Sequence, residues 1–151
     1  MSLASRLKGL FPPTLFLKAL QLSLMAQGIR RQPLLTILVE INSQNHLPLN
    51  ISPRDAQNAV EVAGSILKRF GLLNTCLTRS LAISGLLSDH DNLMLHIGFR
   101  PGTPADLQQT PGHAWLTLDG VNVTDHGLPD PEHTFLCPKQ IIVERTPNAQ
   151  R

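Results

Sequence analysis

The sequence predicts an α+β domain in which N-terminal helices pack on a C-terminal antiparallel sheet. Two observations support this fold class. Apolar residues recur at helical spacing up to about residue 88, and strand-like apolar segments bounded by turn residues follow from residue 93. Helices that come first and strands that come later are typical of the α+β class.

The composition fits one globular domain and excludes several function classes. The chain has 151 residues, of which 42% are hydrophobic and 16% charged, so it can bury a sizeable core. A formal net charge of +2 without a basic run gives no footprint for nucleic acid. The two cysteines cannot form a disulfide framework and indicate a reducing, cytoplasmic setting.

Residues 1–50 are predicted to form a helical segment that packs on or docks to a core domain of residues 51–151. Pro12-Pro13 precedes a helix over about 14–28, which Gly28 can end. A short helix over 34–42 and a loop over 42–50 follow. The leucine-rich helix has a secretory signal as its alternative, but Lys18 and Gln21 interrupt it. No run reaches the roughly 18 apolar residues of a membrane span.

The core domain has clear helix signals. Ser52 is the expected N-cap of a helix with Pro53 at its first position, and Gly71 is the expected end. Asn74 or Thr75 caps the next helix, which covers about 76–88. The expected strands are 93–99, 113–118, 121–125 and 141–144, with Asp119-Gly120 as a hairpin turn between the second and third.

Cys76, His113 and Asp125 form the candidate catalytic set. Cys76 lies in the first turn of its helix, where the helix dipole and free N–H groups favour a thiolate and can hold an oxyanion. His113 begins a strand and can accept the thiol proton, and Asp125 on the next strand can orient the imidazole. The alternative for Cys76 is a small buried apolar residue.

The hairpin register tests this triad. A two-residue Asp119-Gly120 turn pairs Leu118 with Val121 and places Asp125 on the sheet face opposite His113. A three-residue loop places the two residues opposite each other on one face. A working triad therefore requires the three-residue loop. Asp119 and Asp130 are rival acids with poorer expected positions.

Other residues near these motifs have weaker assignments. Trp115 shares the His113 face and either lines the active-site cleft or packs in the core. Arg79, one turn after Cys76, can meet a substrate carboxylate or Asp125, with a structural ion pair as its alternative. A zinc site from His126, His133 and Cys137 matches no common ligand spacing, so we expect neither a metal nor a cofactor.

The motifs resemble a known superfamily. The segment Cys76–Ala82, the strand end Ile97–Arg100, His113-Ala114-Trp115 and the Asn122–Asp125 segment are similar to the transglutaminase-like superfamily. Within it, the chain resembles the stand-alone leader peptidases of lasso-peptide biosynthesis. The resemblance covers roughly residues 52–145, and a Val-Thr-Asp ending replaces the common Val-Asn-Asp.

The resemblance implies a papain/transglutaminase-like fold and a cysteine peptidase that removes the leader from a ribosomally made precursor peptide. It further implies a leader-binding recognition protein as partner, and the lasso cyclase is a further candidate partner. Two alternatives stay open: a transglutaminase-like acyl transferase, which uses the same residues, and a non-catalytic peptide-binding adaptor.

Overall fold

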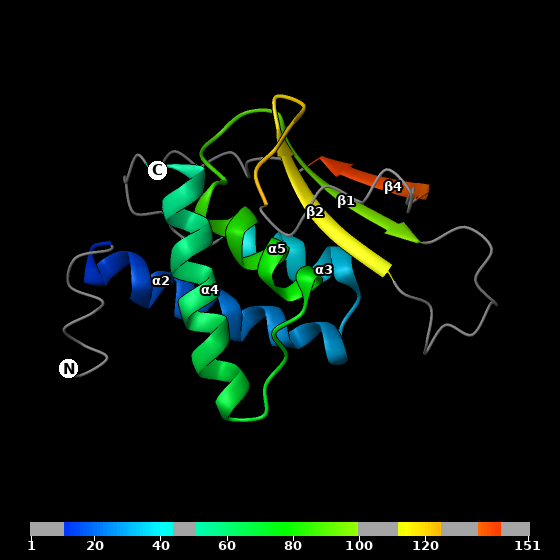
Figure 1. The fold of residues 1–151 in the computed structure, drawn as a ribbon. Coiled ribbons are helices and arrows are strands. Elements are labelled where there is room, and N and C mark those ends of the chain that lie inside the picture. Colours follow the sequence, from blue (N-terminus) through cyan, green and yellow to red (C-terminus); the bar gives the residue numbers. More distant parts are fainter. Residues whose placement is uncertain (1–10, 44–50, 100–111, 125–135, 143–151) are drawn as a thin grey trace, which may run out of the picture.

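The computed structural model describes residues 11–43, 51–99, 112–124 and 136–142. Within them the fold is α+β, with the helices gathered on one face of a four-stranded antiparallel sheet (Figure 1). The expected fold class and the order of helices before strands are confirmed at this level. Most of the expected loop over 42–50 and the whole of the segment 100–111 lie outside the described residues.

The first described helix, α2 (Pro13–Ala26), continues as a 3-10 turn, η1 (Gln27–Arg30), and is followed by α3 (Leu34–Ser43). Pro13 suits the first helical position, where its missing N–H would have had no partner. Leu15, Ala19 and Leu22 are at most 3% exposed and belong to the same apolar core as α4, α5 and the sheet. Because η1 includes Gly28, the helical segment does not end at this glycine as expected.

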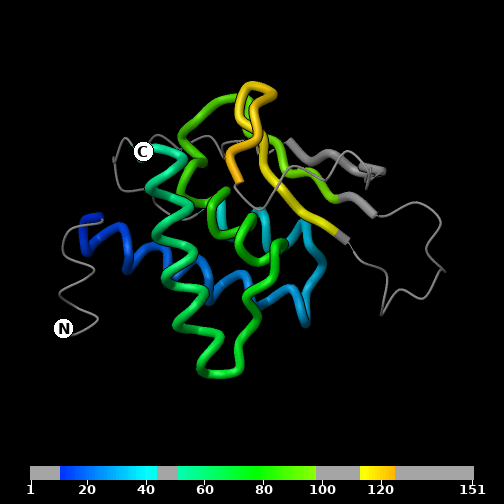
Figure 2. Tube along the Cα trace, viewed as in Figure 1, coloured from blue at the N-terminus to red at the C-terminus, as the bar shows by residue number. Residues whose placement is uncertain are grey.

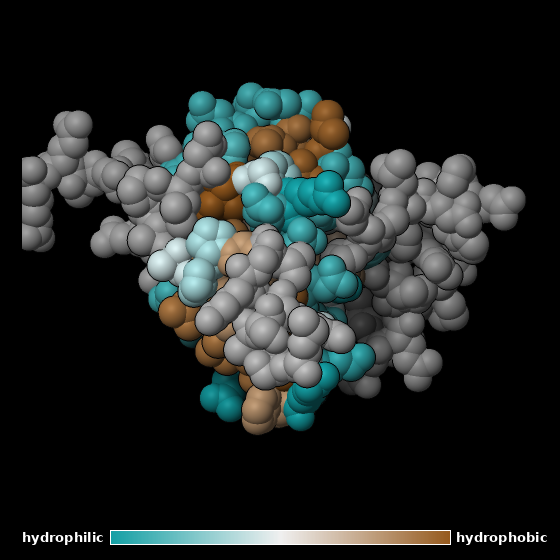
Figure 3. Space-filling view, turned by 60° about the vertical axis from the view of Figure 1, so that its left-hand side comes forward, coloured by the Kyte–Doolittle hydropathy of each residue, from teal (hydrophilic) through white to brown (hydrophobic). Residues whose placement is uncertain are grey.

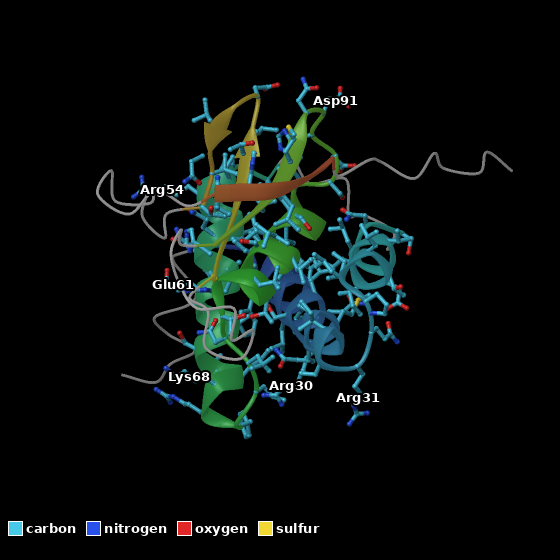
Figure 4. The ribbon with its side chains drawn as sticks, turned by 90° about the vertical axis from the view of Figure 1, so that its right-hand side faces the viewer. Arg30, Arg31, Arg54, Glu61, Lys68 and Asp91 are labelled. Atoms are coloured by element: carbon cyan, nitrogen blue, oxygen red, sulfur yellow. The ribbon has the colours of Figure 1, made fainter. Side chains whose placement is uncertain are left out.

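Helix α4 (Pro53–Arg69) has both of its expected ends. The Ser52 hydroxyl accepts the Asp55 amide at 3.1 Å, as an N-cap does. Gly71 has φ +75° and follows the last turn. The amides of Gly71 and Leu72 donate back to Lys68 and Leu67, which closes the helix in a Schellman arrangement. Figure 4 shows the exposed charged residues Arg54, Glu61 and Lys68 along its outer side.

Helix α5 (Cys76–Leu86) lies at the centre of the molecule and ends two residues before its expected end. Figure 2 follows the chain from α4 through a short connection into this helix. α5 contacts α2, α3, α4 and the sheet. Gly85 allows this close packing, because a Cβ there would lie 2.7 Å from Ile41 Cγ2 and 2.9 Å from Leu22 Cδ1.

The sheet has the strand order β3-β2-β1-β4, from β1 (Leu93–Phe99), β2 (Gly112–Leu118), β3 (Val121–Asn122) and β4 (Leu136–Ile142). Leu93, Leu95, Ala114 and Leu116 are at most 2% exposed and form the helix-facing side. The intervening residues of β1 and β2 face the other way, as strand geometry requires. β3 is shorter than the expected 121–125, and β4 begins before the expected residue 141.

In the described part of the chain, none of the helices combines the length and the hydrophobicity needed to cross a membrane. Large apolar side chains do reach the surface, at Leu17 and Leu24 on α2 and at Leu35 and Val39 on α3. On the side drawn in Figure 3, apolar residues appear at several separate places among hydrophilic ones.

Candidate active site

Cys76 is the first residue of α5 and is partly exposed. Thr75 caps the helix: its hydroxyl accepts the Thr78 amide at 3.2 Å, and the Thr78 hydroxyl accepts the Thr75 amide at 2.9 Å. This reciprocal pair is a capping box built from two threonines. It places the Cys76 side chain at the positive end of the helix dipole, where an anion is stabilised. Of the two expected caps, Thr75 is therefore the correct one.

The segment before Cys76 is fixed from two sides. The Gln27 side-chain amide bonds both groups of one residue: its Oε1 accepts the Leu73 N–H at 2.8 Å, and its Nε2 donates to the Leu73 carbonyl at 2.9 Å. On the α4 side, the Asn74 amide oxygen occupies the space that a Cβ at Gly64 would need. The position of the candidate nucleophile thus depends on α2 and α4 as well as on its own helix.

Gln27→Leu should lower the free energy of unfolding by about 1–3 kcal/mol, because it leaves the N–H and C=O of Leu73 without their partner. Gln21→Leu is the matched control, since Gln21 is an exposed residue of the preceding helix α2 and its side chain accepts a hydrogen bond from Lys18 at 3.3 Å. That control should change the free energy by less than about 0.5 kcal/mol. Urea unfolding measures both variants, and equal effects would contradict the anchoring role of Gln27.

One hydrogen bond joins the nucleophile helix to the histidine strand. The Ser80 hydroxyl donates to the Ala114 carbonyl at 3.2 Å, and both residues are buried. Ser80 is four residues after Cys76, so the two side chains lie on the same face of α5. Ala114 directly follows His113. The bond therefore brings the first turns of α5 alongside the beginning of β2, as Figure 1 shows.

The Ser80 contact is made at the edge of β2 that faces β3. The Leu116 carbonyl accepts a hydrogen bond at 3.0 Å from the amide of Val123, which directly follows β3. Backbone groups two residues apart point to the same edge of a strand, so the Ala114 carbonyl points there too. β3 pairs only with Thr117 and Leu118 among the described residues. The first turns of α5 therefore lie beside the same edge of β2, next to the part that pairs with β3.

The His113 side chain lies on the sheet face opposite the helices, because Ala114 faces the core. Its ring is half-buried and stacks on Trp115, with ring centroids 5.6 Å apart and planes 20° from parallel. The expectation that Trp115 shares the His113 face is thus confirmed. A Cys76–His113 pair has to form around the β3-side edge of β2, where the start of α5 lies.

A third ring, which the sequence did not single out, completes this stack. His96 is the cross-strand partner of Trp115, and their centroids are 5.2 Å apart with planes 7° from parallel. His96 Nε2 is 2.8 Å from Thr117 Oγ1. Burial lowers the pKa of His96 from its usual 6.5. At neutral pH this imidazole is therefore uncharged.

The three-residue hairpin loop that the triad was expected to need is absent between the described strands β2 and β3. The structure pairs Leu118 with Val121 across the two-residue turn, and Asp119 and Gly120 have φ values of 50° and 79°. Positive φ at both central positions is typical of a type I′ turn, whose twist matches that of the strands. In an unbroken ladder this register would place Asp125 on the face away from His113.

The ladder changes before it reaches Asp125. The Leu116 amide donates to the Thr124 hydroxyl at 3.2 Å, and the Thr124 amide donates to the Asn122 side chain at 2.8 Å. This side-chain turn ends the regular pairing after Val123. Strand alternation therefore does not determine the direction of Asp125, which lies outside the described residues. Its role stays a prediction.

The structure describes two of the three remaining candidate residues, Asp119 and Arg79. Asp119 accepts the Asn92 side-chain amide at 2.9 Å at the hairpin tip, six residues after His113 and at the opposite end of β2. Asp130 lies outside the described residues. Arg79 is half-buried, and its Nε is enclosed without a hydrogen-bond partner. Its contact with a substrate carboxylate or with Asp125 stays a prediction.

In the part of the chain that the structure describes, no three His, Cys, Asp or Glu side chains are grouped as metal ligands. His126 and His133 lie outside it. Sequence reasoning did not find Gln27, Ser80 and His96, because each acts through a contact between segments distant in the chain. The Thr75-x-x-Thr78 spacing was the one local signal for the cap.

Comparison with known proteins gives no relative: no protein-family model, no curated protein and no solved structure matches this chain.

Proposed function

We propose that this protein is a cysteine peptidase with a papain/transglutaminase-like arrangement, in which Cys76 is the nucleophile, His113 the general base and acid, and Asp125 the orienting carboxylate. The observation that carries the proposal is the Ser80–Ala114 hydrogen bond. It joins the helix that begins with Cys76 to the strand that begins beside His113. The bond supports the proposed arrangement, in which the helix of the nucleophile lies beside the strand of the histidine.

The start of α5 has free backbone amides that can stabilise the oxyanion formed in acyl transfer. The first amide–carbonyl bond of the helix runs from Arg79 back to Thr75, so the amides of Cys76 and Leu77 precede the intrahelical ladder. In the proposed reaction His113 takes the thiol proton, and the thiolate attacks the scissile carbonyl carbon. These amides stabilise the oxyanion. His113 then protonates the leaving amine, and a water molecule activated by His113 hydrolyses the thioester.

The proposed substrate is the precursor of a lasso peptide, cut between leader and core. This part of the proposal is supported by the resemblance of the Cys76–Ala82 and His113-Ala114-Trp115 segments to the stand-alone leader peptidases. A leader-binding recognition protein would present the precursor, and the lasso cyclase would then close the ring. The small sheet and a low aromatic content of 4% suit an enzyme that relies on a partner for substrate recognition.

Product analysis tests this function. The purified protein is incubated with a precursor peptide and the recognition protein encoded beside it, and the products are identified by mass spectrometry. A free leader and a free core peptide are the expected products. A new isopeptide bond would instead identify a transglutaminase-like acyl transferase. Unchanged precursor, together with no selective labelling of Cys76 by a thiol-reactive probe, would identify a peptide-binding adaptor.

A further inference from the structure

The outer face of the sheet carries three stacked rings. His113, Trp115 and His96 have near-parallel planes and neighbouring centroids within 5.6 Å. The bond between His96 Nε2 and Thr117 Oγ1 holds the His96 ring on the Thr117 side of Trp115. His113 is two residues away in the opposite direction along β2. The indole therefore lies between the two imidazoles.

We propose that Trp115 is a positioning residue whose indole stabilises the protonated imidazole of His113. The proposal rests on the function proposed above, in which the Cys76 thiol proton moves to His113. A cation within about 6 Å of the centroid of a Trp ring is attracted by the negative face of that ring. The neutral imidazole gains less from the same contact, so the stack favours the protonated form. The thiolate of Cys76 is thereby favoured as well.

His96 keeps the indole available to His113. A second imidazolium against the same ring would repel the first, but burial lowers the pKa of His96 and keeps it neutral at pH 7. Its hydrogen bond to Thr117 and its stack with Trp115 also restrict rotation of the indole. His96 thus supports the position of Trp115 without competing for its negative face.

Groups other than the indole also influence the pKa of His113, so the test has to keep them constant. From α5 the ionisable groups nearest the beginning of β2 are Cys76 and Arg79. Both groups are the same in all the Trp115 variants that are compared, so a difference in the His113 pKa between these variants does not come from them.

The test is an NMR titration of the His113 imidazole in the Cys76→Ala protein, where the thiolate is absent. Trp115→Leu should lower the pKa of His113 by about 0.4–0.7 unit, since a cation–π contact contributes about 0.5–1 kcal/mol at a partly exposed site and one pKa unit corresponds to about 1.4 kcal/mol. Trp115→Phe keeps an aromatic face and should give a smaller decrease. Met94→Leu, on the same sheet face but outside the stack, should leave this pKa unchanged.

A pKa of His113 that is the same with Trp115, Phe or Leu at position 115 overturns the inference. If Trp115→Leu fails to fold, the comparison of Trp115 with Phe decides alone, because Phe keeps the ring in the half-buried site. Thr117→Val gives a second measurement: it removes the His96 hydrogen bond and should produce a decrease in the same direction.

A separate measurement distinguishes this inference from the proposed function. In the protein with Cys76 intact, the pH dependence of alkylation by iodoacetamide reports the pKa of the Cys76 thiol. Trp115→Leu should raise that pKa if Cys76 and His113 form a pair. A shift of the His113 pKa without any change in the alkylation profile would leave the stack established and would refute the proposed pair.

Discussion

Cys76→Ala is expected to abolish precursor cleavage while the protein stays folded. Loss of the nucleophile in a catalytic triad costs several powers of ten in kcat, so we expect a decrease of at least about 10⁴-fold. The fold should survive, because Cys76 is partly exposed and the Thr75–Thr78 capping box that starts α5 remains in place. Mass spectrometry of the precursor measures cleavage, and urea unfolding measures stability.

Two matched variants make this result specific. Cys137→Ala removes the other cysteine of the chain and should keep full activity. Ser80→Ala keeps the nucleophile but removes the hydrogen bond to the Ala114 carbonyl, so it should lower stability by about 1–3 kcal/mol and reduce kcat only in part. Near-normal processing by Cys76→Ala would refute the proposed mechanism, whatever the control variants show.

The features that were predicted correctly from sequence are encoded locally. Ser52-Pro53 and Gly71 set the ends of α4, because an N-cap hydroxyl, a proline without N–H and a residue with positive φ each act within a few residues. Alternation of side chains along β2 likewise placed Trp115 on the His113 face. No partner distant in the chain is needed for any of these inferences.

The hairpin loop was predicted incorrectly because the prediction started from the catalytic triad and not from the turn residues. Asp119-Gly120 is a strong local signal for a two-residue turn, and the structure has that turn. The three-residue loop was required only because a regular ladder would otherwise direct Asp125 away from His113. The Thr124 and Asn122 side chains end the ladder first, and the sequence pattern gave no sign of this.

The contacts that build the candidate site were beyond sequence reasoning for a different reason. Gln27 and Leu73 are 46 residues apart, and Ser80 and Ala114 are 34 apart. Each pair depends on how α2, α5 and the sheet pack together, which periodicity does not determine. His96 has no local sequence signal for a role, and only the β1–β2 register places it against Trp115. The framework of the site is therefore a property of the tertiary structure.

Asp125→Asn is expected to lower kcat by about four powers of ten, as loss of the orienting carboxylate does in serine-protease triads. The affinity for the precursor should barely change, because the role is confined to the chemical step. Single-turnover cleavage measures the rate, and fluorescence anisotropy of a labelled precursor bound to the Cys76→Ala and the Cys76→Ala/Asp125→Asn proteins measures the affinity.

The acids on either side of Asp125 along the chain provide the controls. Asp119→Asn should leave the rate almost unchanged, since Asp119 bonds Asn92 at the hairpin tip. Asp130→Asn is the decisive comparison: if it stops cleavage while Asp125→Asn remains active, Asp130 is the orienting acid. If only Asp125→Asn loses activity, Asp125 is the orienting acid, as the sequence motif predicts.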